Sequence, residues 1–166
     1  MLNNVVEIIQ MDKRVSVKNN DVIVNCNSLQ DAKCCTEVLD TIFNKGEVVV
    51  SIDYMDFINK SGTIEYDLEL TKNIVLNNYN EYIRKIEVAD NCKCIICLVG
   101  NINLTDATKT MEKVMELLDK HNNLIILYGL IYDEKHQENE FDLYIWKEVL
   151  KDENSKGSCS YNKIKK

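Results

Sequence analysis

Two aspartates three residues apart have the residue type and spacing best suited to chemistry in this chain. Asp53 and Asp56 stand where an apolar, extended segment at 48–50 gives way to helical periodicity. Aspartate at such a junction has a structural use, because its carboxylate accepts hydrogen bonds from the free N–H groups of the first helical turn. It also has a chemical use, since two carboxylates on one turn can hold a water molecule or a cation against a phosphate group. The spacing alone favours the cap, and both interpretations remain open.

Three closely spaced cysteines favour a structural role. Cys92, Cys94 and Cys97 could bind a metal as thiolates, but the chain offers no second pair of ligands at the spacing of a zinc site. The apolar run at 94–99 instead predicts a buried strand, in which cysteine behaves as a small apolar residue. We expect no metal site and no cofactor.

An acidic strand and two histidines are the remaining titratable groups of interest. Glu65, Asp67 and Glu69 alternate with apolar residues along a predicted strand, so they could bind a cation, although a solvated acidic face is the commoner outcome. His121 follows a helix end and His136 lies in a charged turn. Neither histidine has a serine or cysteine partner that the sequence can place, so nucleophilic catalysis has no support.

Composition limits the class of protein. The chain has 166 residues, of which 45% are hydrophobic and 28% charged, which is enough to form one folded domain with a core. Its net charge of -7 argues against a broad nucleic-acid-binding surface. No apolar run approaches the roughly 20 residues needed to span a bilayer, and no secretion signal is visible at the N-terminus. We expect a cytoplasmic protein that binds neither nucleic acid nor membrane.

Apolar periodicity predicts the elements that must position these residues. Ser28 is expected to cap a helix over 29–44, Thr105 a helix that extends to 120, and a short helix is expected over 54–60. A further helix is expected over 71–88, and strands are expected at 5–9, within 15–26, and at 63–70, 94–99, 124–131 and 141–149. This order predicts an α+β fold, with a mixed β-sheet and helices packed mainly on one face. Residues 1–150 would form a single domain, followed by a polar, disordered tail at 151–166.

Three short motifs occur in an order that resembles one known family. The segment 98–105, LVGNINLT, has the form of a strand, a glycine-containing turn and a Leu-Thr helix start. The segment 123–134, NLIILYGLIYDE, has the form of a strand with an internal glycine and an acidic turn, and 59–63, NKSGT, has a Ser-Gly-Thr strand start. Together they resemble the C-terminal domain of the tubulin/FtsZ superfamily, on the bacterial FtsZ side, over residues 5–147.

The resemblance implies a role for the aspartate pair. In this family, a helix like 28–44 is the core helix that joins two domains, and the segment like 45–57 is the synergy loop. That loop enters the nucleotide pocket of the next subunit in a filament and helps to activate the water that attacks GTP. The family pattern Asn-x-Asp-x-x-Asp matches Ser51, Asp53 and Asp56, which would therefore be catalytic in trans. Serine in place of asparagine keeps a hydroxyl group but loses the amide, and Gly46 lies five residues before Ser51 rather than two or three.

The GTP-binding half of the family is missing from this chain. Its phosphate loop needs several adjacent glycines, so that backbone N–H groups can surround the phosphates. This chain has five glycines, and no two of them are adjacent. We therefore expect no GTPase activity from the chain alone, which is either part of a longer GTPase or a stand-alone domain.

Two functional hypotheses follow. The first is an assembly module that contacts FtsZ/tubulin-like GTPase subunits or itself, in cell division or cytoskeletal filaments, and supplies the aspartate pair in trans. In one variant of this hypothesis the domain caps filaments. The alternative is a stand-alone α+β ligand-binding or regulatory domain that shares only its architecture with FtsZ.

Overall fold

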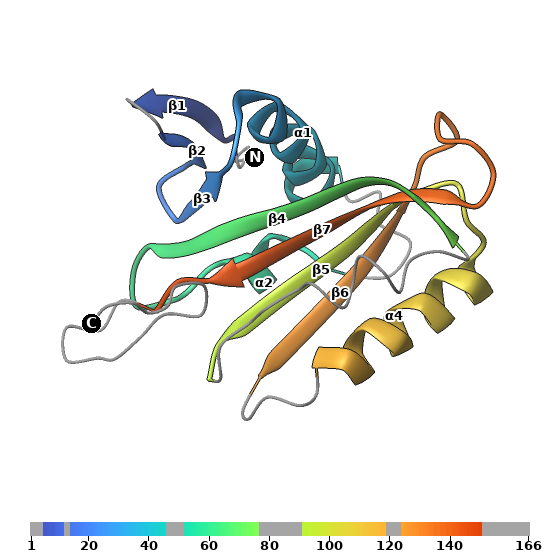
Figure 1. Cartoon of the computed structure of the whole chain (residues 1–166). Coiled ribbons are helices and arrows are strands. Elements are labelled where there is room, and N and C mark those ends of the chain that lie inside the picture. The colour runs from blue at the N-terminus through green and yellow to red at the C-terminus, as the bar shows by residue number, and fades with distance from the viewer. Residues whose placement is uncertain (1–4, 12–13, 46–51, 77–90, 119–123, 151–166) are drawn as a thin grey trace.

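The computed structural model describes residues 5–11, 14–45, 52–76, 91–118 and 124–150 (Figure 1). The helical elements are α1 (Leu29–Asp40), its π-helical continuation η1 (Thr41–Lys45), α2 (Tyr54–Phe57) and α4 (Leu104–Leu118). The strands are β1 (Glu7–Met11), β2 (Arg14–Lys18), β3 (Val22–Cys26), β4 (Ile64–Val75), β5 (Lys93–Gly100), β6 (Ile125–Tyr132) and β7 (Glu140–Glu148). None of the described helices combines the length and the apolar character that crossing a bilayer requires.

One mixed sheet contains all the described strands, in the order β1-β2-β3-β4-β7-β5-β6. β3 pairs with β4 and β5 pairs with β6 in parallel, whereas the other neighbours are antiparallel. The last strand in sequence, β7, therefore lies in the interior of the sheet, between β4 and β5 (Figure 1). This arrangement confirms the predicted α+β class with a mixed sheet.

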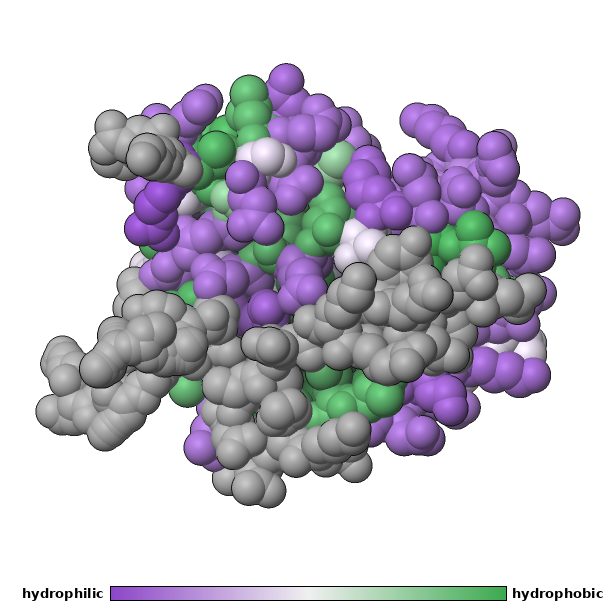
Figure 2. Space-filling view, viewed as in Figure 1, coloured by the Kyte–Doolittle hydropathy of each residue, from purple (hydrophilic) through white to green (hydrophobic). Residues whose placement is uncertain are grey.

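The sheet separates two apolar cores. Along β5, alternate side chains point to opposite faces, as the period of a strand requires. Ile95, Cys97 and Val99 join a core with α1, η1 and α2, on what we call the α1 face. Cys94, Ile96 and Leu98 join a core with α4, on the α4 face. Hydrophilic residues cover most of the described surface in the view of Figure 2, and apolar residues show only in separate patches.

Side-chain caps determine where two helices begin. The Asp31 N–H donates to Ser28 Oγ at 3.0 Å, as predicted for the start of α1. For α4 the prediction of Thr105 as the cap is wrong. Asn103 Oδ1 accepts from the Asp106 N–H at 2.8 Å, so the helix begins at Leu104 and Thr105 lies within its first turn.

β4 extends beyond its predicted end, and the helix predicted from Thr71 is wrong over its first residues. The strand runs on to Val75, with a register shift between Thr71 and Ile74 opposite β7. Asn73 takes a positive φ of 58° within this irregularity, and its N–H donates to Asp142 Oδ1 at 2.8 Å. The β-branched Ile74 and Val75 fit a strand as well as a helix, so periodicity could not distinguish the two. The rest of that predicted helix and the predicted tail lie outside the described residues.

Candidate functional site

The aspartate pair forms a reciprocal capping box at the start of α2. Asp53 has extended backbone angles, and its Oδ1 accepts from the Met55 N–H at 3.0 Å. In return, Asp56 Oδ2 accepts from the Asp53 N–H at 2.9 Å. Each carboxylate thus satisfies a backbone donor that the first helical turn leaves without an intrahelical partner. The capping interpretation of the spacing is confirmed.

The cap engages Asp53 Oδ1 and Asp56 Oδ2, and the Asp53 carboxylate also accepts from the Asp56 N–H. The structure therefore brings these two predicted site residues together, in hydrogen-bonding contact. In the described part of the chain, no hydrogen bond other than the one from the Asp53 N–H reaches the Asp56 carboxylate. The third predicted residue, Ser51, lies outside the described residues. The catalytic role of all three stays a prediction.

An aromatic cluster anchors α2 to the α1 face. Phe57 is fully buried and meets Phe43, Tyr66 and Trp146 edge to face, with ring centroids 5.1, 5.8 and 5.1 Å away. The Tyr66 hydroxyl donates to the Phe57 carbonyl at 2.8 Å, so the C-terminal end of the helix is also held. Such offset ring pairs add to the stabilisation that burial alone provides. A single helical turn, which is unstable alone, is thereby held rigidly.

Tyr54 holds the outer side of the same turn. Its ring packs edge to face on Phe43 at 4.8 Å, and its hydroxyl donates to Asp21 at the turn before β3. Burial raises the pKa of Tyr54 to about 12, with a further contribution from the hydrogen bond to Asp21. Between the two aspartates, Met55 is 62% exposed. We call the group Asp53, Met55 and Asp56 the α2 tip.

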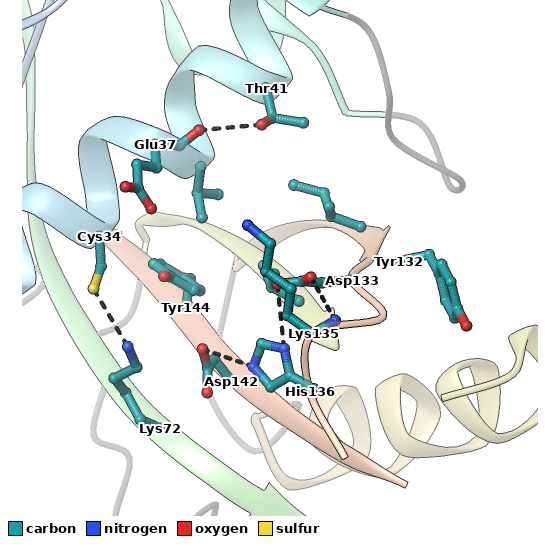
Figure 3. A pocket seen from close by; sticks show the side chains of 13 residues that line it. Cys34, Glu37, Thr41, Lys72, Tyr132, Asp133, Lys135, His136, Asp142 and Tyr144 are labelled. Carbon is teal, nitrogen blue, oxygen red and sulfur yellow. Dashed lines mark hydrogen bonds and ion pairs between the residues drawn. The ribbon is translucent and has the colours of Figure 1, made fainter. Parts of the chain in front are cut away.

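A second candidate site is a cavity of about 600 Å³ between α1 and strands β4 to β7 (Figure 3). His136 Nε2 lies 3.0 Å from Asp142 Oδ2, and Asp142 Oδ1 also accepts from the Asn73 N–H. His136 Nδ1 lies within ion-pair distance of Asp133 Oδ2, at 3.3 Å, but without the alignment of a hydrogen bond. This buried nitrogen has no hydrogen-bond partner in the described part of the chain.

The opposite wall of this cavity carries a lysine beside a thiol. Lys72 Nζ donates to Cys34 Sγ at 3.4 Å. Burial acts to lower the pKa of Lys72, but Cys34 and the nearby carboxylate of Asp142 raise it above its ordinary value overall. Tyr144 completes the floor, and burial raises the pKa of its hydroxyl. Charged groups of both signs line the cavity, an arrangement that suits a small polar ligand with both kinds of charge.

This cavity was not predicted from the sequence. His136 was expected in a charged turn, without a serine or cysteine partner, whereas it pairs with the carboxylate of Asp142 on β7. A signal was present, because Asp142 is a carboxylate within the apolar strand segment FDLYIW. A charged residue is almost never fully buried unless it is paired. That rule would have required a cationic or hydrogen-bonding partner near Asp142.

The acidic strand is paired rather than solvated, which corrects the prediction of a solvated face. Asn25 Nδ2 donates to Glu65 Oε2 at 2.6 Å and to Asp67 Oδ1 at 2.9 Å. Lys147 Nζ lies 2.8 Å from Glu69 Oε1. All three acidic residues are half-buried. Their oxygens therefore serve a cross-strand polar network on the α4 face.

The cysteines of β5 are core residues, as predicted. Cys94 packs on the α4 face and Cys97 on the α1 face, so the two sulfur atoms point away from each other. Burial raises the pKa of Cys94 to about 12 and raises that of Cys97 further. Thiols of this kind are inert, and these two do not converge on a common ligand.

Comparison with known proteins gives one kind of match. No family model and no curated protein matches the chain. Among solved structures, the chain is similar to the FtsZ W319Y mutant of M. jannaschii, with a TM-score of 0.41 and 19% identity over 72% of this chain. It is also similar to the empty FtsZ dimer of M. jannaschii, with a TM-score of 0.40 and 15% identity over 73% of this chain. The chain spans 40% of the length of each of these FtsZ chains, and the similarity concerns the fold.

Proposed function

We propose that this chain is an assembly domain whose α2 tip contacts a tubulin-like GTPase, where Asp53 and Asp56 act on the partner's nucleotide in trans. The α2 tip is the observation that supports this function. It combines an exposed methionine, 62% accessible, with two neighbouring carboxylates, of which Asp56 keeps one oxygen outside the cap in the described structure. The order of motifs, which resembles that of the FtsZ C-terminal domain, supports this class of partner.

Rigidity is the first argument for a contact surface. A protein interface gains affinity when its residues are already held in the bound arrangement, because less conformational entropy is lost on binding. The α2 tip meets this condition, since Phe57 is buried in the aromatic cluster and the capping box orients both carboxylates. An exposed apolar side chain between charged groups is a common form of small contact surface.

Charge is the second argument. A carboxylate oxygen can orient a water molecule for attack, or accept its proton, when it lies within hydrogen-bonding reach. The chain has no glycine-rich phosphate loop, so the nucleotide and its counter-charges would come from the partner. In this proposal Asp53 and Asp56 position the water, and Ser51 contributes a hydroxyl group from the preceding segment.

The test needs a variant that keeps the helix cap at Asp53 and removes the negative charge. Asparagine caps a helix about as well as aspartate, so Asp53→Asn should keep α2 folded and lose only the charged oxygen. Asp53→Ala removes both the helix cap and the negative charge. Added to a polymerising FtsZ-type GTPase from the same cell, the wild-type chain should stimulate GTP turnover, and Asp53→Asn should still co-pellet with the polymer but stimulate at least tenfold less. Met55→Asp serves as the contact variant and should no longer co-pellet.

Two outcomes would change the proposal. If Asp53→Asn and Asp56→Asn both stimulate turnover as the wild type does, the carboxylates serve only as caps. If the wild-type chain shortens polymers at substoichiometric amounts without stimulating turnover, the domain caps filaments. Either result leaves the α2 tip as a contact surface, whereas retained co-pelleting of Met55→Asp would rule that out.

A second candidate function is ligand binding in the cavity of Figure 3. The observation in its favour is the buried His136 Nδ1, which has no hydrogen-bond partner among the described residues and lies in a cavity lined also by Asp142 and Lys72. A screen of zwitterionic metabolites by thermal shift would test it. A stabilising ligand whose effect is lost in His136→Gln and kept in Asp53→Asn would favour this function over the assembly domain.

A further inference from the structure

The sulfur of Cys34 lies beside two hydrogen-bond donors. Lys72 Nζ donates to Cys34 Sγ at 3.4 Å, and Gln30 Nε2, one turn earlier on α1, donates to it at 3.7 Å. A neutral thiol is only a weak acceptor, whereas hydrogen bonds to an ionised group are stronger. The thiolate is also the nucleophilic form of cysteine. The two donors therefore supply the counter-charge that a nucleophilic sulfur needs.

The cavity of Figure 3 gives access to this sulfur, because Cys34 is part of its lining. Cys34 is 8% exposed, whereas the next residue on the helix, Cys35, is completely buried, and burial raises the pKa of its thiol. Gln30 and Lys72 are exposed residues, so the two side chains that touch the sulfur can turn aside for a reagent. The structure thus distinguishes two adjacent cysteines by their access to the cavity.

Cys26 shows that a similar exposure does not create the same environment. It is 9% exposed, but its S–H donates to the Val24 carbonyl at 3.8 Å. A sulfur that donates a hydrogen bond keeps its proton, so Cys26 is held as a neutral thiol. Cys34 instead accepts from an ammonium group. The contact with Lys72 is therefore the feature that makes Cys34 suited to attack a ligand.

We propose that Cys34 is a site of reversible modification, where a small disulfide of the amino-acid type forms a mixed disulfide with the chain. The Cys34 thiolate attacks one sulfur of that disulfide, and the new S–S bond forms as the old one breaks. The other half leaves as a thiolate and takes a proton from water. Cys34 is oxidised and the released half is reduced, so no further oxidant is needed. This proposal uses the cavity of the second candidate function but adds a covalent bond to it.

The charges around the sulfur favour a ligand that carries both a carboxylate and an ammonium group. Lys72 Nζ lies 3.4 Å from Cys34 Sγ, and a new S–S bond is about 2.0 Å long, so a carboxylate two carbons from the ligand's sulfur comes within reach of this ammonium. Glu37 also lines the cavity, on the next turn of α1, and supplies a carboxylate for the ligand's ammonium group. A cysteine-type thiol has both groups at this spacing. The cavity of about 600 Å³ is in the range of small-molecule sites.

Incubation of the full, folded chain with cystine, and separately with cystamine, tests the site and its charge preference. The two halves of cystamine carry ammonium groups but no carboxylates. Mass spectrometry of peptides then gives the rate of modification at each cysteine, and division by the rate in the urea-unfolded chain removes the intrinsic reactivity of each reagent. We expect an adduct on Cys34 that dithiothreitol releases and that forms about tenfold faster with cystine than with cystamine. Cys26 and Cys35 should react much more slowly than Cys34.

Variants of exposed lysines test the role of Lys72. Lys72→Met keeps the length of the side chain but removes the ammonium group, so it should slow the reaction with cystine about tenfold and remove the preference over cystamine. Lys109→Met makes the same change on α4 and should react as the wild type does. A folded chain that cystine leaves unmodified at Cys34 would overturn the proposal, as would equal rates for Lys72→Met and the wild type.

The result is separable from both functions proposed above. Asp53→Asn should be modified as fast as the wild type, because the α2 tip is not part of the cavity lining. Cys34→Ser should carry no adduct at residue 34, whereas a non-covalent ligand of the second candidate function should still stabilise it in a thermal-shift assay. Modification that persists in the other cysteines of Cys34→Ser at the wild-type total rate would show that Cys34 is not the reactive site.

Discussion

At the residue scale, Tyr54 connects the α2 tip to the rest of the molecule. Its hydroxyl donates to Asp21, which precedes β3, and its ring packs on Phe43 within η1. It therefore joins two segments that are far apart in the sequence. Loss of this contact should loosen the α2 tip before it affects the sheet.

The raised pKa of Tyr54 makes this contact dependent on pH. The pKa rises from 10.0 to about 12 on folding, so the folded chain holds the phenolic proton more tightly than the unfolded chain. The stabilisation is complete below pH 10 and is lost as the pH rises towards 12. We expect Tyr54→Phe to be less stable than the wild type at pH 8, and this difference to disappear by about pH 12. Urea unfolding followed by fluorescence of Trp146, the only tryptophan, would measure both. A difference independent of pH would show that the hydroxyl does not contribute.

Local interactions were predictable at this scale, and long-range ones were not. The caps at Ser28 and Asp53 each join atoms within three residues, so the sequence pattern contains all the information they need. The pairing of His136 with Asp142 depends instead on how the turn after β6 folds back over β7. The network of Asn25 with Glu65 and Asp67 requires β3 to lie beside β4, which is a property of the whole sheet.

At the scale of elements, the pairing of β5 with β7 depends on one glycine. Gly100 lies opposite Phe141 at the end of both strands. A Cβ atom at Gly100 would stand 2.4 Å from the Glu140 carbonyl oxygen and 2.5 Å from Phe141 Cα. Both are backbone atoms, which cannot rotate away as a side chain can.

We therefore expect Gly100→Ala to lower the free energy of unfolding by roughly 3 kcal/mol, the upper range for overpacked sites. The clash should separate the ends of β5 and β7 next to the turn that holds His136. Urea unfolding gives the stability. Lys113→Ala, on the exposed side of α4, is the control and should stay within about 0.5 kcal/mol of the wild type. A Gly100→Ala variant as stable as this control would mean that the two strand ends separate at no cost.

The ends of the strands show where the spacing of apolar residues no longer predicts the structure. β5, β6 and β7 were predicted within two residues, because each is a compact apolar run. β4 was predicted to end at Leu70, since Ile74 and Val75 also suit the apolar face of a helix. β4 extends further because it pairs with β7. The irregularity at Asn73 preserves this pairing, and the Asn73 N–H is held there by a hydrogen bond to Asp142. Such a tertiary contact overrides local preference and has no local pattern.

At the scale of the whole molecule, the α2 tip and the β6 end of the sheet are separate. The α2 tip belongs to the α1 face through Phe57, whereas β6 ends the order of described strands beyond β5.

The position of β7 leads to the last prediction. This final strand pairs with β4 on one side and β5 on the other, so without it the sheet divides into two parts, each with an incomplete core. The Val149 N–H still donates to the Glu65 carbonyl at 2.8 Å, and Leu150 packs against the core of the α4 face, so contacts of the described chain continue to its last residue. We expect a chain ending at Leu150 to unfold cooperatively, and a chain ending at Glu138 not to fold.

Circular dichroism and urea unfolding of the two truncated chains would test this expectation. The shorter chain should show no cooperative transition, because burial of Trp146 and Phe141 is lost from the α1 and α4 faces together. A cooperative transition in the shorter chain would show that β1 to β6 fold without the central strand. Folding of the complete chain should also be slow for its size, because β4 and β5 cannot be joined until the C-terminal strand lies between them, and such non-local pairing delays the transition state.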